Sequence, residues 1–272
     1  MQKSYYRVLL SVYIVSVVVC TTIQTVLRLR YTNTSTGFYN GGGNMVLALH
    51  VLIPAAVMFW FLMTLFRKTG HEFPVYHFGA AARVGSLICG CSILANTLAM
   101  SWSEFVRFVE LTNWERLFFA AVLIFGVLGS CSMVWFAIRL SSEKGNIIGI
   151  FPAVWQLIVL LGRYKEVPTL TAVSESMFLV LFMCFATIFL LGQARTLCGY
   201  RPPNGRNYTI PAGLAASLFG LLLVVPGAAN SLAEGRWSPL RGMEPVFWVY
   251  VLVLTIYVMI FLVDYIRSIR IV

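Results

Sequence analysis

The sequence predicts an all-α integral membrane bundle, and two observations carry this prediction. Hydrophobic residues make up 59% of the 272 positions and charged residues only 11%, whereas soluble domains carry about 25% charged residues. A chain with so few charges lacks the polar side chains that a water-facing surface needs. The apolar residues also gather in long runs of roughly 17–25 residues, the length at which a helix crosses the hydrocarbon core of a bilayer.

Eight such runs divide the chain, and we expect each to form a transmembrane helix. They cover residues 8–27, 45–66, 79–100, 117–138, 147–164, 177–194, 209–230 and 245–266. The connecting segments are short, so residues 1–272 are expected to form a single membrane domain. The first run follows Lys3 and Arg7, as a secretion signal would. No small-x-small cleavage site comes after it, so we expect a retained helix.

The basic residues predict that both termini lie in the cytoplasm, as an even number of helices allows. In this orientation the cytoplasmic segments hold twelve of the twenty Lys and Arg residues, in keeping with the positive-inside rule. The twelve are Lys3, Arg7, Arg67, Lys68, Arg83, Arg139, Lys144, Arg195, Arg201, Arg206, Arg267 and Arg270. Acidic residues lean outward, which agrees with this orientation but adds little because they contribute weakly to the rule.

The net charge of +10 does not indicate a nucleic-acid partner. The basic residues are scattered in ones and twos between apolar runs, without the basic stripe that marks a nucleic-acid-binding surface. The expected partner is the lipid bilayer of the cell membrane. A second membrane protein or a homo-oligomeric copy is a further candidate partner.

Four polar residues are predicted to converge in an outward-facing vestibule. His50 lies about 7–8 Å below the outer edge at 1.5 Å per residue, and Gln156 lies near the midplane. Arg163 and Glu175 face each other across the loop between the fifth and sixth helices. Polar side chains within spans mark function by default. The plainer interpretation is that they are interfacial groups or make ordinary hydrogen bonds between helices.

Two stripes of small residues predict close helix packing. Ala82, Ser86 and Gly90 recur every four residues in the third run, and Gly213, Ser217 and Gly220 form a similar stripe in the seventh. Small residues on one face let helix backbones approach each other in lipid. Chance in a glycine-rich chain is the alternative, and such stripes concern assembly rather than activity.

No catalytic motif was found in the sequence, which argues against an enzyme without excluding one, and we expect no cofactor. Gly-x-Ser-x-Gly, His-Glu-x-x-His and P-loop patterns do not occur. Cys89 and Cys91 are two residues apart, so on a helix they point to nearly opposite sides and cannot grip one metal ion. Asp264 lies one turn before Arg267, which predicts a local ion pair.

One stretch resembles a known group of proteins. It runs from Phe151 through PAVWQLIVLLGRY and then VSESMFLVLFMCFATIFLLGQAR to Arg195. Its Pro-x-x-Trp element, Pro152 to Trp155, and its closing Ala194-Arg195 resemble uncharacterised multi-pass membrane proteins of Gram-positive bacteria. The resemblance implies a bacterial membrane location and no catalytic activity.

Three classes of function stay open at this point. The first is a small-molecule transporter or permeation-type protein that uses the polar vestibule as its entrance. The second is a non-catalytic sensor or accessory subunit that acts through a membrane-protein partner. The third, an intramembrane enzyme, has the least support because no motif for it is present.

Overall fold

A computed structural model describes residues 2–31, 79–106, 111–138, 147–166, 173–198, 208–235 and 244–268. Every regular element in these ranges is helical. The long helices are α1 (Gln2–Val26), α3 (Ala80–Val106), α4 (Asn113–Ile138), α5 (Phe151–Glu166), α6 (Val173–Leu197), α7 (Thr209–Glu234) and α8 (Pro245–Ser268). A π-helical turn, η1 (Leu27–Tyr31), extends α1, and a 3₁₀ turn, η2 (Ile147–Ile150), leads into α5.

Seven segments of the described ranges are long and apolar enough to cross a membrane. The all-α class and the multi-pass membrane character are therefore confirmed. The run at 45–66 lies outside the described residues. The total of eight helices and the placement of both termini in the cytoplasm stay predictions.

The beginning of α4 shows what a count of apolar residues overlooks. The predicted span began at residue 117, whereas the helix begins at Asn113. Thr112 and Glu115 explain the difference, because the Glu115 carboxylate accepts hydrogen bonds from the Thr112 backbone N–H at 2.9 Å and hydroxyl at 2.8 Å. The Glu115 N–H donates in turn to the Thr112 hydroxyl at 3.4 Å. This reciprocal arrangement is a capping box, which starts a helix at polar residues.

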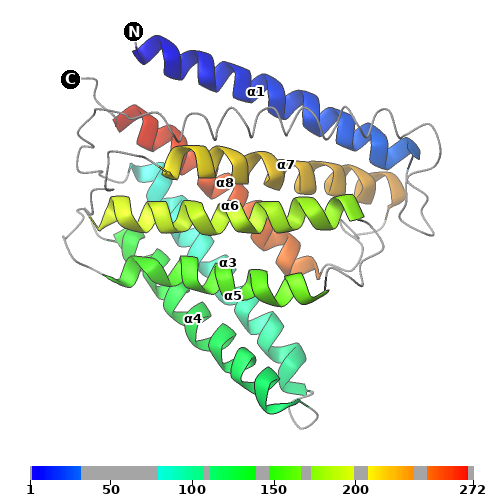
Figure 1. Cartoon of the computed structure of the whole chain (residues 1–272), viewed down its shortest axis with the longest axis vertical. Coiled ribbons are helices and arrows are strands. Elements are labelled where there is room, and N and C mark those ends of the chain that lie inside the picture. Colours follow the sequence, from blue (N-terminus) through cyan, green and yellow to red (C-terminus); the bar gives the residue numbers. More distant parts are fainter. Residues whose placement is uncertain are drawn as a thin grey trace.

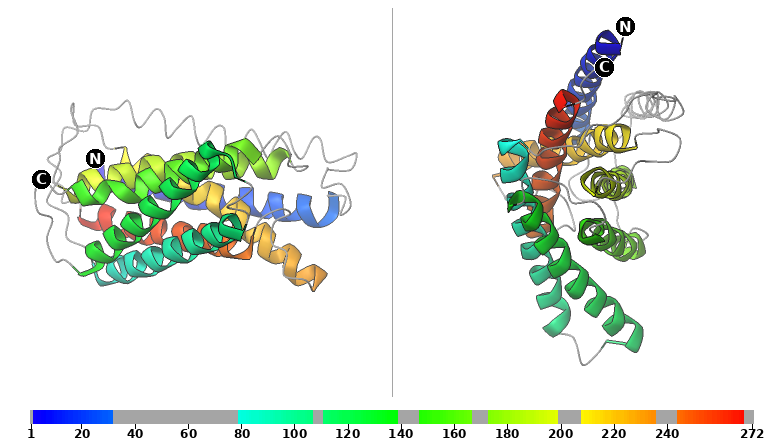
Figure 2. Two further views of the ribbon diagram at one scale, coloured as in Figure 1. Left: turned by 90° about the horizontal axis from the view of Figure 1, so that it is seen from below. Right: turned by 90° about the vertical axis from the view of Figure 1, so that its left-hand side faces the viewer.

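Six helices form a closed ring. α3 packs against α4 and α8, α5 against α4 and α6, and α7 against α6 and α8. Figure 1 shows α5, α6 and α7 side by side, with α3 and α8 crossing behind them, and the right-hand view of Figure 2 shows the same two layers from the side. α1 lies outside the ring against α7 and runs in the same direction as α7.

Neighbouring helices of the ring run antiparallel. Gly90 of α3 lies against Met133 of α4, whereas Thr97, two turns further along α3, lies against Gly126, which precedes Met133 in α4. The up-and-down order places the first turn of α3 and the last turns of α6 and α8 at one end of the bundle. The last turns of α1 and α5 and the first turn of α4 lie at the other.

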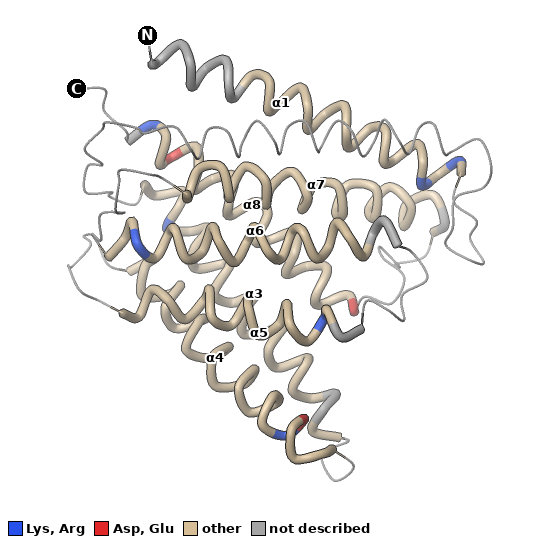
Figure 3. The backbone as a smooth tube through the Cα atoms, viewed as in Figure 1, with Lys and Arg blue, Asp and Glu red and all other residues tan. Residues whose placement is uncertain are grey.

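The described charged residues lie towards these two ends of the backbone (Figure 3). Arg83, Arg195 and Arg267 belong to the end where α8 finishes. Between the ends the outer surface is apolar, with Ile88, Ile124 and Ile256 among its exposed residues. A charge-poor apolar band between two charged rims is the surface that a bilayer requires.

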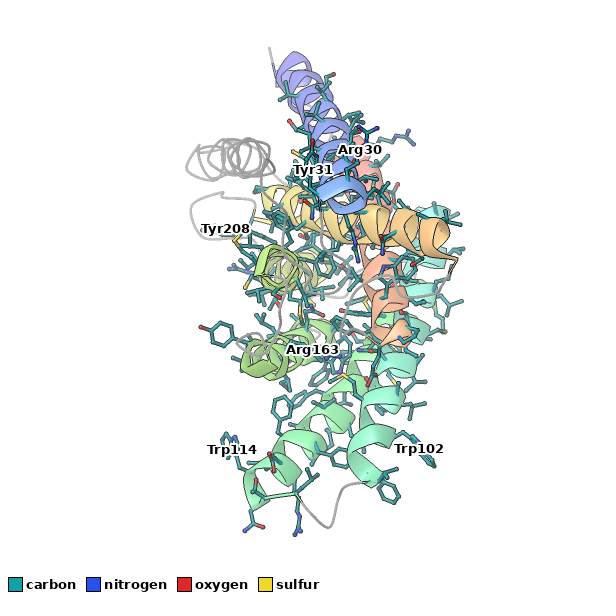
Figure 4. All side chains as sticks on the ribbon, turned by 90° about the vertical axis from the view of Figure 1, so that its right-hand side faces the viewer. Arg30, Tyr31, Trp102, Trp114, Arg163 and Tyr208 are labelled. Carbon is teal, nitrogen blue, oxygen red and sulfur yellow. The ribbon has the colours of Figure 1, made fainter. Side chains whose placement is uncertain are left out.

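Exposed aromatic residues mark the end of the bundle opposite to Arg267. Trp102 near the end of α3, Trp114 at the start of α4 and Tyr164 near the end of α5 are 71%, 70% and 65% exposed. Figure 4 shows Trp102 and Trp114 directed away from the bundle. Tryptophan and tyrosine gather at the interface between lipid and water because their rings are apolar with one polar atom. These residues therefore indicate where this face of the bilayer lies.

The α3 stripe of small residues lies close to α4. A Cβ atom on Gly90 would lie 3.1 Å from the Met133 side chain and 3.1 Å from the Ser130 carbonyl oxygen. The hydroxyl of Ser86 donates a hydrogen bond to the Met133 carbonyl at 2.7 Å, and Ala82 is fully buried.

The α7 stripe divides between two directions. Gly213 lies against Phe189 of α6 and Leu262 of α8, and Gly220 lies against Thr255 of α8 and Phe182 of α6. Ser217 instead faces α1, where its hydroxyl and the Tyr13 hydroxyl are 2.6 Å apart in a hydrogen bond. The two glycines thus lie at the contact of α7 with the ring, and the serine at the contact that holds α1.

Candidate functional site: a polar column inside the helix ring

Five polar side chains from three helices lie inside the ring, and together we call them the polar column. They are Trp155 and Gln156 of α5, Gln193 of α6, and Tyr250 and Tyr257 of α8, each at most 1% exposed. The two tyrosines are seven residues apart, so they lie on the same face of α8. Their separation along the axis is about 10 Å at 1.5 Å per residue.

Tyr250 organises the first unit of the column. Its hydroxyl donates a hydrogen bond to Oε1 of Gln156. Its ring meets the Trp155 ring edge-on, with centroids 5.1 Å apart and an interplanar angle of 90°. Pro152 fits in the first turn of α5 because that position needs no backbone N–H donor. Trp155 and Gln156 then point into the ring one turn later.

Tyr257 organises the second unit. Nε2 of Gln193 donates to the Tyr257 hydroxyl at 2.5 Å, and the Ser86 hydroxyl lies beside it. Since Ser86 also donates to the Met133 carbonyl, this unit joins α6, α8, α3 and α4. Cys89, one turn after Ser86 and fully buried, lies near both tyrosine hydroxyls and so links the two units.

Three atoms of the column find no hydrogen-bond partner among the described residues. They are the indole Nε1 of Trp155, the amide Nε2 of Gln156 and the amide Oε1 of Gln193. Buried polar atoms are nearly always paired, and one left unpaired costs about 1–3 kcal/mol. Two of the three, on consecutive residues of α5, are donors.

Arg163 lies two turns beyond Gln156 on α5, towards the end of the bundle that carries the exposed aromatics. Its guanidinium lies 4.6 Å from the centroid of the Phe247 ring, a cation–π contact, and Phe247 packs on Tyr250 with centroids 5.9 Å apart. Figure 4 shows Arg163 between α5 and the layer that contains α8. The column therefore connects to a cationic group at that end.

The structure places the predicted vestibule residues as follows. Gln156 and Arg163 both contact the first two turns of α8, through Tyr250 and Phe247. Glu175 lies in the first turn of α6, and its side chain is not among those described. His50 lies outside the described residues. The convergence of all four stays a prediction.

Buried polar groups also lie beyond the part of the bundle where the sequence predicts the vestibule. Gln193 lies in the last turns of α6, and its partner Tyr257 lies at the middle of α8. The tyrosine of this second unit is easily overlooked because tyrosine counts among the hydrophobic residues. Two signals were available: Gln193 is an amide inside the predicted span at 177–194, and the seven-residue spacing of Tyr250 and Tyr257 places both hydroxyls on one face.

Comparison with protein-family models, with curated proteins and with solved structures finds no match to this chain. The function must be argued from the column itself.

The described cysteines and acidic residues do not gather into a set of metal ligands. No group of three or more His, Cys, Asp and Glu side chains there could hold a metal ion. Cys89 is buried and Cys91 is exposed, so these two thiols lie on different faces of α3.

Proposed function

We propose that the protein is a transporter or permeation-type protein of the bacterial cell membrane that carries a small polar solute along the polar column. The observation that carries this proposal is the Tyr250–Gln156–Trp155 unit, in which two buried N–H donors find no acceptor in the part of the chain that the structure describes. Apolar residues of similar size would fill the same space without this cost. Polar groups kept in the interior of a membrane bundle typically line the path of a solute or ion.

The order of groups along the column supports an entrance from the end with the exposed aromatics. Arg163 and Phe247 lie next to the column at this end, Gln156 and Tyr250 follow, and Gln193 and Tyr257 come last. The distance from Phe247 to Tyr257 along α8 is about 15 Å at 1.5 Å per residue, half of a hydrocarbon core of about 30 Å.

Aromatic packing closes the column beyond Tyr257. Phe261 meets Phe189 edge-on, with centroids 5.4 Å apart, and stacks on Tyr265 at 5.8 Å. All three rings are buried. A polar column that reaches a cationic side chain, Arg163, at one end and meets buried aromatic packing beyond Tyr257 at the other fits an outward-facing state. Transport would require these rings to move.

Flux through reconstituted liposomes tests this proposal. Purified protein in liposomes is exposed to a gradient of a small uncharged solute, such as urea or glycerol, and the volume change is followed by stopped-flow light scattering. We expect faster solute entry than in protein-free liposomes, and a loss of that increment in Gln156→Leu.

The matched control is Thr187→Val, a nearly isosteric change on α6 outside the column, where the hydroxyl bonds the Met183 carbonyl of its own helix. Flux unchanged by Gln156→Leu, or equal in liposomes with and without protein for every solute tried, would contradict the proposal.

An accessory subunit or sensor is the second candidate, and the α3–α4 end favours it. In Figure 1 this end projects beyond the other helices of the ring, and its Phe105 and Val106 are 63% and 71% exposed. A membrane-protein partner that packs against this end would bury these exposed apolar side chains. A stoichiometric partner that co-purifies from native membranes, together with an absence of flux, would place this function first.

A further inference from the structure

Two donors of the polar column find no acceptor among the described residues, and they belong to neighbouring side chains that share one contact. Trp155 and Gln156 are consecutive in α5, both are fully buried, and both touch Tyr250. The Tyr250 hydroxyl donates to Oε1 of Gln156. Because Oε1 faces the tyrosine, the N–H donors on Nε2 of the same amide face away from it. The indole of Trp155 can only donate, so the unit offers N–H groups and needs an acceptor.

Among the described residues, the groups that interact with Tyr250 are uncharged side chains. They are Trp155, Gln156, Phe247 and Cys89. The nearest cation along α5, Arg163, lies over the Phe247 ring, two helical turns from Gln156. Because burial of an unpaired charge costs far more than burial of a hydrogen-bonded neutral group, these surroundings favour a neutral acceptor over an anion.

We propose that Trp155 and Gln156 form a subsite for the carbonyl oxygen of a small uncharged amide or urea-type solute, with Tyr250 as the residue that positions the Gln156 amide. This proposal rests on the proposed transport function and names its substrate class. A carbonyl oxygen has two lone pairs and accepts from both N–H groups at once. The N–H groups of the same solute can donate to the Tyr250 oxygen, which still has acceptor capacity.

The indole N–H of Trp155 gives a direct measure of binding. Protein labelled with ¹⁵N-tryptophan in detergent micelles shows one indole signal for each of its seven tryptophans, and Trp155→Phe identifies the signal of Trp155. We expect titration with acetamide or urea to shift this signal in a saturable way. The other six signals report that the fold is intact.

Two variants test this subsite. Gln156→Leu removes one donor, and we expect about tenfold weaker binding, the effect of one well-formed hydrogen bond. Thr187→Val changes a side chain outside the column, where the hydroxyl bonds the Met183 carbonyl of its own helix, and should leave the titration of the Trp155 signal unchanged. Equal weakening by both variants would overturn the assignment to Trp155 and Gln156.

The remaining outcomes also decide the matter. Saturable shifts with sodium chloride but not with acetamide or urea would show an anion site and overturn the neutral-solute assignment. A Trp155 signal that none of these solutes moves would mean that the donors hold ordered water only. Saturable binding without liposome flux would leave the subsite standing and remove the transport proposal, whereas flux without a shift of the Trp155 signal would do the reverse.

Discussion

The carboxylate of Asp264, near the end of α8, accepts a hydrogen bond from the backbone N–H of Gly79 at 2.7 Å. Gly79 directly precedes α3, and its carbonyl accepts the first helical hydrogen bond, from the Arg83 N–H. The negative charge of Asp264 therefore lies at the positive end of the α3 helix dipole, where it stabilises the helix. Asp264 of α8 thus caps the beginning of α3 and links α3 to α8 at one end of the ring.

Asp264→Asn should lower the stability of the ring. The change keeps an acceptor but removes the charge, and we expect a loss of about 0.3–2 kcal/mol, the range for a charge at a helix terminus. Thermal unfolding of the purified protein in micelles measures the effect. Arg267→Gln is the control, because it removes the ion pair that the sequence suggested for Asp264. An equal loss in both variants would assign Asp264 to that pair rather than to the α3 cap.

Gly79→Ala should weaken the same contact from the other side. A Cβ atom at this position would lie 2.6 Å from Oδ2 of Asp264, so the carboxylate must move away from the Gly79 N–H. Because both changes disrupt one interaction, we expect the double variant Gly79→Ala with Asp264→Asn to lose clearly less stability than the sum of the single losses. Additive losses in thermal unfolding would show that the two residues act independently.

Gly220→Leu should impair assembly of the bundle. A side chain there meets Thr255 of α8 and Phe182 of α6, and excess volume in a packed interior costs about 1–3 kcal/mol or more. We expect a lower yield of folded monodisperse protein by size-exclusion chromatography and a lower melting temperature. The control is Val225→Leu. Val225 lies on α7 and is 40% exposed, so lipid can accommodate the added bulk. If the Gly220→Leu variant melted at the same temperature as the unmodified protein, the predicted close packing at Gly220 would be contradicted.

Cys198 reports the orientation of the chain in the membrane, provided that pH is controlled. It lies just beyond the α6 span, and burial raises the pKa of its thiol. Since the thiolate is the reacting form, a raised pKa lowers the thiolate fraction at neutral pH, and labelling should accelerate as pH rises. In a variant with Cys198 as its sole cysteine, we expect an impermeant maleimide to label the protein at about pH 8.5 only after the cells are permeabilised.

The control for this experiment is Trp114→Cys in a background without other cysteines. Trp114 is exposed at the opposite end of the bundle, and its replacement should react in intact cells. Labelling of Cys198, but not of the cysteine at position 114, in intact cells would reverse the orientation.

The sequence determined the class of this protein because hydropathy is a local property. A run of apolar residues has to be helical in lipid whatever it packs against, since each backbone polar group needs a partner within the segment. The sequence also singled out Gln156, because an amide in the middle of an apolar run is visible without knowledge of any neighbour.

Only the tertiary structure decided which groups meet. From the sequence we predicted that Gln156 converges with His50, Arg163 and Glu175, and His50 lies outside the described residues. The described structure pairs Gln156 with Tyr250, 94 residues away in the chain. Gln193 and Tyr257, and Asp264 and Gly79, are likewise partners distant in the sequence. The physical reason is that a pairing between helices depends on the rotation of each helix about its own axis and on its neighbours in the ring. The packing of all the helices together sets both, and no single apolar run contains that information.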